Sequence, residues 1–237
     1  MKDIDLELPG SENTNLEEAS VDEYWITYRQ HIHTLLAWGY TVSRSRVQTS
    51  HEEPDITGFI AEAIQSILDD PNSPSWCDQI AIKDDPPIPG GERTGRKRWR
   101  PDLIFESVER RPRPKYHFEA KRLRKEQSIA TYLGEDGLQC FLSGRYAHEC
   151  NEAGMLGYVQ CDDINAWVER LQWAIHQDSQ DKNGLLLLSP QRNFQIIDTF
   201  PQEWLSKHGR RTGQSIAIYH LLLDYCIMSP AEVMVDV

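Results

Sequence analysis

The chain of 237 residues is long enough for one large domain or two small ones. Its composition, 39% hydrophobic and 26% charged residues, is usual for a globular protein and excludes a chain that is disordered over its whole length. No stretch approaches the ~18–20 apolar residues of a membrane span, and the acidic start lacks the apolar run of a signal peptide. Five scattered cysteines without a C-x-x-C pair argue against a disulfide framework or a zinc site, so we expect reduced thiols in a cytoplasmic protein.

The charges are distributed unevenly along the chain. The net charge is −12, yet residues 93–125 hold thirteen Lys and Arg against four Asp and Glu, a local balance of +9 that leaves −21 for the rest. This pattern predicts a basic face on an acidic body, and such a face attracts a polyanion whatever the overall charge. A solvated loop rich in arginine is the alternative interpretation.

The first part of the chain reads as largely helical. Residues 1–20 indicate a disordered acidic tail, and apolar side chains at helical spacing predict amphipathic helices over residues 21–40 and 52–70, with Asp55 as the N-cap of the second. Residues 76–82 are typical of a short strand. A loop rich in Pro and Gly follows.

The remainder alternates strands and helices. Two strands, around residues 99–107 and 115–122, are joined by the Arg/Pro turn "VERRPRP", which returns the chain antiparallel. Beyond them we expect helices over residues 134–150 and 162–177, the second capped by Asp162 or Asp163, and strands over residues 153–161, 184–189, 194–200 and 215–227. This interleaving predicts one α/β domain over residues 21–237, with a mixed central sheet flanked by helices.

Two carboxylates and a lysine stand out in the hairpin. Glu119 and Lys121 are two residues apart on a predicted strand and therefore share one face, while Asp102 begins the preceding strand. Two carboxylates held together would repel each other, but Mg²⁺ between them keeps both ionised. A lysine beside such a metal site can position water or neutralise charge on a phosphate.

The segment "PD" at residues 101–102, followed by "EAK" at residues 119–121, resembles the motif of the PD-(D/E)XK nuclease superfamily. The resemblance covers residues 52–161 and implies a restriction-endonuclease-like core. It also implies a Mg²⁺-dependent phosphodiesterase, with a DNA endonuclease favoured, in which Mn²⁺ substitutes for Mg²⁺. Stand-alone members often act in restriction or anti-phage defence.

The resemblance also assigns roles to individual residues. Many members add an acidic residue from the first helix, and Glu62 is the match, so the expected metal ligands are Glu62, Asp102 and Glu119, with Lys121 as the residue that activates water. Some relatives carry Q-x-x-x-Y on the next helix. This chain departs from that motif, because Ser143 lies four residues after Gln139 and Tyr146 seven, but Gln139 and Tyr146 share one face of the predicted helix and are expected to have supporting roles. The residues expected to bind nucleic-acid phosphates are Arg96, Lys97, Arg98, Arg100, Arg122 and Arg124.

Other interpretations stay open at this point. A nuclease-like fold can serve as a catalytically silent module that binds nucleic acid or assembles into a larger complex. The basic segment alone would also suit a metal-independent RNA-binding protein. If these residues form no functional site, Asp102 is a turn residue at the start of a strand, and Glu119 and Lys121 are a solvated pair on an edge strand. The expected partner is nucleic acid, with DNA favoured over RNA. The sequence also leaves open a homodimer or a partner chain of a defence complex.

Overall fold

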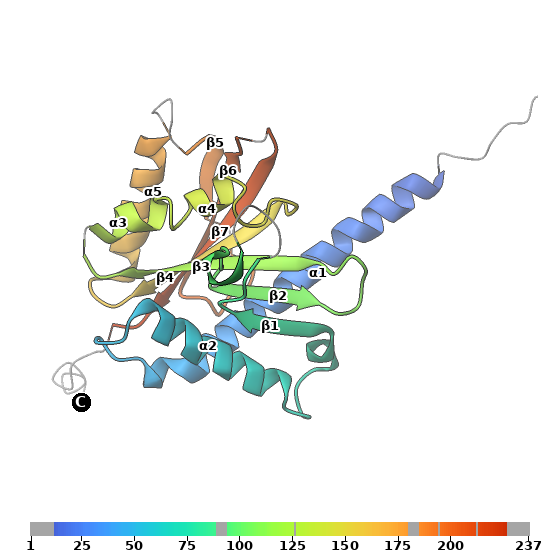
Figure 1. The fold of residues 1–237 in the computed structure, drawn as a ribbon, viewed down its shortest axis with the longest axis horizontal. Coiled ribbons are helices and arrows are strands. Elements are labelled where there is room, and N and C mark those ends of the chain that lie inside the picture. The colour runs from blue at the N-terminus through green and yellow to red at the C-terminus, as the bar shows by residue number, and fades with distance from the viewer. Residues whose placement is uncertain are drawn as a thin grey trace, which may run out of the picture.

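The structure is a computed structural model that describes residues 12–88, 94–125, 127–179, 185–193, 195–211 and 213–226. None of its helices within these ranges combines the length and apolarity needed to cross a membrane. The elements, drawn in Figure 1, are α1 (Glu12–Ser43), α2 (Glu53–Leu68), β1 (Ile80–Asp84), β2 (Leu103–Ser107), β3 (Lys115–Leu123), α3 (Gln127–Leu133), α4 (Gln139–Leu142), β4 (Glu152–Val159), α5 (Ile164–Asp178), β5 (Leu187–Asn193), β6 (Gln202–Gly209) and β7 (Ser215–Asp224), with short 3-10 turns η1 (Arg44–Arg46), η2 (Ser75–Gln79) and η3 (Gly95–Lys97).

One open sheet organises the chain. Its seven described strands lie in the order β1-β2-β3-β4-β7-β6-β5. The central pairs β3–β4 and β4–β7 are parallel, and the outer pairs are antiparallel. The predicted α/β architecture with a mixed sheet flanked by helices is therefore confirmed, and the hairpin of β2 and β3 lies where the Arg/Pro turn predicted it.

Each face of the sheet has its own core. Apolar side chains of α1 and α2 pack on one face, against residues such as Phe118 and Ala120 of β3. The region of α3, α4 and α5 packs on the other face, against residues such as Leu123 and Met155. Because side chains alternate along a strand, Glu119 and Lys121 belong to the second face.

Helix α1 begins earlier than the sequence predicted. It starts at Glu12, so residues 12–20 of the expected disordered tail are helical, and Figure 1 shows this end reaching beyond the body of the protein. Acidic residues near a helix N-terminus interact favourably with the helix dipole, which suits this segment to a helix. The first eleven residues of the predicted tail lie outside the described residues.

The predicted helix over residues 134–150 was wrong in extent. Only the short helix α4 lies within this range, and α3 ends just before it, at Leu133. Gly134 and Gly137 lie between them, and a Cβ at Gly137 would come within 2.2 Å of the Tyr132 carbonyl oxygen, so the tight turn there requires glycine. Gly144 then ends the helical stretch with φ of 75°, a left-handed conformation that glycine adopts readily.

The strand pattern near the C-terminus also differs from the prediction. Residues 195–200 form bends and a turn in place of the strand predicted over residues 194–200, of which residue 194 lies outside the described residues. Strand β6 was missed because polar residues occupy buried positions in it. One of them, Glu203, is fully buried against His33, with 2.8 Å between Oε1 and Nδ1. Hydrophobic periodicity does not reveal a strand that buries polar partners.

Candidate active site

The candidate active site forms where β3 loses its antiparallel neighbour. Strand β2 begins at Leu103, opposite Phe118, so the rest of β3 has a free edge on that side. The Ala120 N–H donates to the Asp102 carboxylate over 2.6 Å, and the Arg122 N–H donates to Glu53 Oε2 over 3.2 Å. Two carboxylates thus take the place of a neighbouring strand, which fixes both at one edge.

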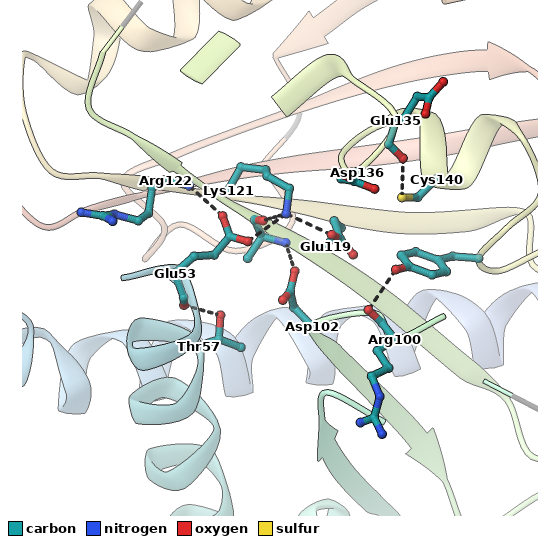
Figure 2. Close-up of polar contacts among 12 residues, drawn as sticks. Glu53, Thr57, Arg100, Asp102, Glu119, Lys121, Arg122, Glu135, Asp136 and Cys140 are labelled. Carbon is teal, nitrogen blue, oxygen red and sulfur yellow. Dashed lines mark hydrogen bonds and ion pairs between the residues drawn. The ribbon is translucent and has the colours of Figure 1, made fainter. Parts of the chain in front are cut away.

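Lys121 lies at the centre of this group. Its ammonium donates to Glu53 Oε1 over 2.9 Å, to Glu119 Oε1 over 3.0 Å and to the Ala120 carbonyl oxygen over 2.5 Å. Figure 2 shows the carboxyl groups of Glu53, Asp102 and Glu119 gathered around it. Only 6% of Glu119 and 6% of Lys121 are exposed, so the solvated edge pair considered from the sequence is excluded.

Burial and mutual repulsion shift the acidity of these groups. Burial raises the pKa of Asp102 to about 6, although Lys121 and the Ala120 N–H act in the opposite direction. The pKa of Glu119 is also raised, chiefly by burial and then by the charge of Asp102. Burial alone would lower the pKa of Lys121, but the surrounding carboxylates raise it overall, so its ammonium stays charged. A second cation would relieve the remaining repulsion.

Glu119 has an unused oxygen. Its Oε2 atom is buried and has no hydrogen-bond partner, which is costly for a carboxylate unless a further group binds it. Asp102 uses Oδ2 for Ala120, which leaves its other oxygen available. Within the described ranges, no set of three or more His, Cys, Asp or Glu side chains is arranged as a metal cluster. Asp102 and Glu119 instead offer two carboxylates, and Mg²⁺ needs no more than one or two together with water and phosphate oxygens.

Glu62 is not part of this group, contrary to the sequence-based expectation. Its carboxylate is 66% exposed and pairs with Arg46 over 2.7 Å. On helix α2 it lies nine residues beyond Glu53, roughly 13 Å along the axis. The N-terminus of α2, not its middle, meets β3. Glu53 was missed because acidic residues at the start of a helix are usually interpreted as caps. Asp55 also differs from the prediction, since Glu52 is the N-cap and donates its N–H to the Asp55 carboxylate.

The two predicted supporting residues occupy different places. The Tyr146 hydroxyl donates to the Arg100 carbonyl oxygen over 2.9 Å and so holds the segment that leads into Asp102. Arg145, next to it, lies 3.8 Å over the Trp99 ring and anchors the same segment. Gln139 lines a cavity of about 170 Å³ between α4 and the ends of β5 and β6. Helix α4 ends at Leu142, so Gln139 and Tyr146 do not share one helical face as expected.

Several of the predicted phosphate-binding residues are engaged within the protein. Arg100 binds the carboxylate of Asp85 over 2.8 Å. Arg122 pairs with Glu52, and its Nε donates to Gln160 Oε1 over 2.8 Å. The exposed members of the predicted set are Arg96, Lys97 and Arg124, while Arg98 is partly buried. The basic face near the site is therefore smaller than the sequence predicted.

The chain was also compared with known proteins. No protein-family model matches it, no curated protein matches it, and no solved structure matches it.

Proposed function

We propose that this protein is a Mg²⁺-dependent phosphodiesterase that cleaves DNA internally and is built on a restriction-endonuclease-like core. The observation that carries the proposal is that the carboxyl groups of Asp102 and Glu119 gather around the charged ammonium of Lys121, with one buried oxygen of Glu119 unused (Figure 2). The order α2, β1, β2–β3 hairpin, α3 and α4, β4 also follows the core of the superfamily that the motif resembles, which supports the proposal.

Asp102 and Glu119 are the residues that would hold the metal. They present hard carboxylate oxygens, which Mg²⁺ and Mn²⁺ both accept, and a bound cation would favour the ionised form of both groups, whose pKa values are raised chiefly by burial. When bound there, Mg²⁺ would polarise the phosphodiester and lower the pKa of a water molecule.

Lys121 and Glu53 would then serve the chemistry as a unit. The Lys121 ammonium can donate a hydrogen bond to the attacking water or to a phosphate oxygen that gains charge in the transition state. Glu53 accepts from both the Lys121 ammonium and the Arg122 N–H, so it keeps that ammonium at the free edge of β3. Glu53 is thus a positioning residue in this proposal, and the predicted third metal ligand is not needed.

Metal removal tests the proposal directly. Purified protein should nick or linearise supercoiled plasmid DNA in Mg²⁺ or Mn²⁺ and leave it intact in EDTA, as judged on agarose gels. The silent binding module predicts intact plasmid in every condition. If the protein instead binds RNA without metal, Asp102→Ala should leave RNA binding unchanged and DNA should never be cut.

The two glutamates of α2 provide a matched pair. Glu53→Gln should lower the cleavage rate by roughly 10–100-fold, the usual loss when a residue that orients a catalytic group is changed. Glu62→Gln should leave the rate unchanged, because that side chain is exposed and pairs with Arg46 on the surface. Initial rates on plasmid measure both. Equal rates for the two variants would contradict the role of Glu53, and a loss confined to Glu62→Gln would restore the assignment from sequence.

A further inference from the structure

A second basic surface lies at the opposite end of the β2–β3 hairpin. The turn between the two strands is exposed and rich in arginine, and lysines of β1 and β3 flank it. We call these residues the hairpin patch: Lys83, Arg110, Arg111, Arg113 and Lys115. Two acidic residues, Glu106 and Glu109, lie among them, so the patch together with these two glutamates carries a net charge of +3.

The lysines of the hairpin patch are held in place by one buried carboxylate. Glu106 Oε2 accepts from Lys83 over 2.7 Å, and Glu106 Oε1 lies 3.5 Å from the Lys115 ammonium. Burial alone would raise the pKa of Glu106, but these two lysines lower it overall, so the carboxylate stays ionised. Both lysine side chains are nonetheless 40–48% exposed, which leaves their ammonium groups able to contact a further anion.

The arginine turn is also anchored. The Arg110 guanidinium lies 3.8 Å over the ring of Tyr24 on α1, which ties the turn to that helix. Arg111 and Arg113 are exposed on either side of Pro112. A fixed cation loses less conformational entropy when it binds an anion than a mobile one does, which favours phosphate binding at Arg110.

Lys115 of the hairpin patch shares a face of the sheet with the candidate active site, whereas Arg110 turns toward α1 on the other face. Lys115 and Lys121 are an even number of residues apart on β3, so both side chains point to the same side. Six residues of strand place them roughly 20 Å apart. At ~3.4 Å per base pair, this span corresponds to about six base pairs of duplex. His117 lies between Lys115 and Lys121 on β3 and is buried, so it does not extend the exposed basic surface from one to the other. The hairpin patch and the active site are therefore two separate contact points.

We propose that the hairpin patch binds the phosphate backbone of the same DNA that enters the active site, about six base pairs from the scissile bond. This inference rests on the proposed function for the identity of its ligand. A duplex that reaches both the active site and the hairpin patch should be bound at both places, so the affinity should rise once the duplex is long enough to span them.

Two DNA stem-loops with the same loop test this inference by fluorescence anisotropy in EDTA. A stem of about four base pairs spans roughly 14 Å and reaches one point, whereas a stem of about sixteen reaches both. Wild-type protein should bind the longer stem at least ~10-fold more tightly. Arg111→Ala/Arg113→Ala should lose most of that gain, and the slope of log affinity against log salt should fall by about 2 on the longer stem.

The matched control uses two exposed cations of the opposite edge of the sheet. Arg192→Ala/Lys207→Ala, on β5 and β6, should change neither the affinity nor the slope. An Arg111→Ala/Arg113→Ala protein that keeps the wild-type gain and slope would overturn the inference, and would direct attention to an acidic protein partner for the patch. Because both arginines are exposed, the double variant should keep the wild-type melting temperature.

The binding experiment separates the two proposals. It needs neither metal nor cleavage, so a protein that shows the expected loss but never cuts plasmid in Mg²⁺ would overturn the proposed function alone. A protein that cuts plasmid while its affinity ignores the hairpin patch would overturn the present inference alone.

Discussion

Lys121→Ala should reduce DNA cleavage by roughly 10²–10³-fold, the usual cost of removing one group that stabilises charge in a transition state. The side chain is buried and its ammonium is fixed by Glu53 and Glu119. DNA affinity should change little, because Lys121 is one cation among the several expected to contact phosphate. Plasmid cleavage rates and anisotropy with a duplex measure the two quantities on the same protein.

The substitution will also affect stability. Removing one partner of a buried ion pair costs roughly 3–5 kcal/mol, so both assays should be run well below the melting temperature of the variant. Lys121→Gln keeps a hydrogen-bond donor without the charge and provides a second test. Lys207→Ala, an exposed lysine on β6, is the control and should cut at the wild-type rate. Normal cleavage by either Lys121 variant would contradict the catalytic assignment.

The sequence predicted the overall fold well where local patterns decide structure. Helix α2, the β2–β3 hairpin and helix α5 follow from hydrophobic periodicity and turn residues, and Asp163 caps α5 as one of the two expected residues. The failures have two causes. Strand β6 buries Glu203 against His33, a contact between segments that are distant in the sequence. The turn at Gly137 depends on a close backbone approach to Tyr132, five residues earlier, which hydrophobic periodicity does not report.

In the candidate site, too, some features follow from local sequence patterns and others depend on the tertiary structure. The placement of Asp102 beside β3 and the shared face of Glu119 and Lys121 follow from strand geometry, and the structure brings these three together. The helical acid could not be chosen from sequence, since the choice between Glu53 and Glu62 depends on which end of α2 meets the edge of β3. Internal partners were equally hidden: nothing local indicates that Arg122 pairs with Glu52.

Glu119→Gln should abolish Mg²⁺-dependent cleavage and remove the stabilisation of the protein by Mg²⁺. A metal present at about 100 times its dissociation constant stabilises the folded state by ~2.7 kcal/mol, which for a chain of this length raises the melting temperature by roughly 5–10 °C. The amide of Gln can still accept from the Lys121 ammonium at Oε1. Its other end carries N–H donors and no negative charge, so it cannot replace the unused carboxylate oxygen as a ligand.

The same variant should be at least as stable as the wild type in EDTA. Without metal, the Glu119 carboxyl is buried near Asp102 and its pKa is raised, so a neutral group of equal shape removes a repulsion. Melting curves in EDTA and across a Mg²⁺ titration measure both effects. Glu62→Gln is the control and should keep the full response to metal. A Glu119→Gln protein that is still stabilised by Mg²⁺ would show that the ion binds elsewhere, and Asp102 and Glu119 would no longer be candidates for its ligands.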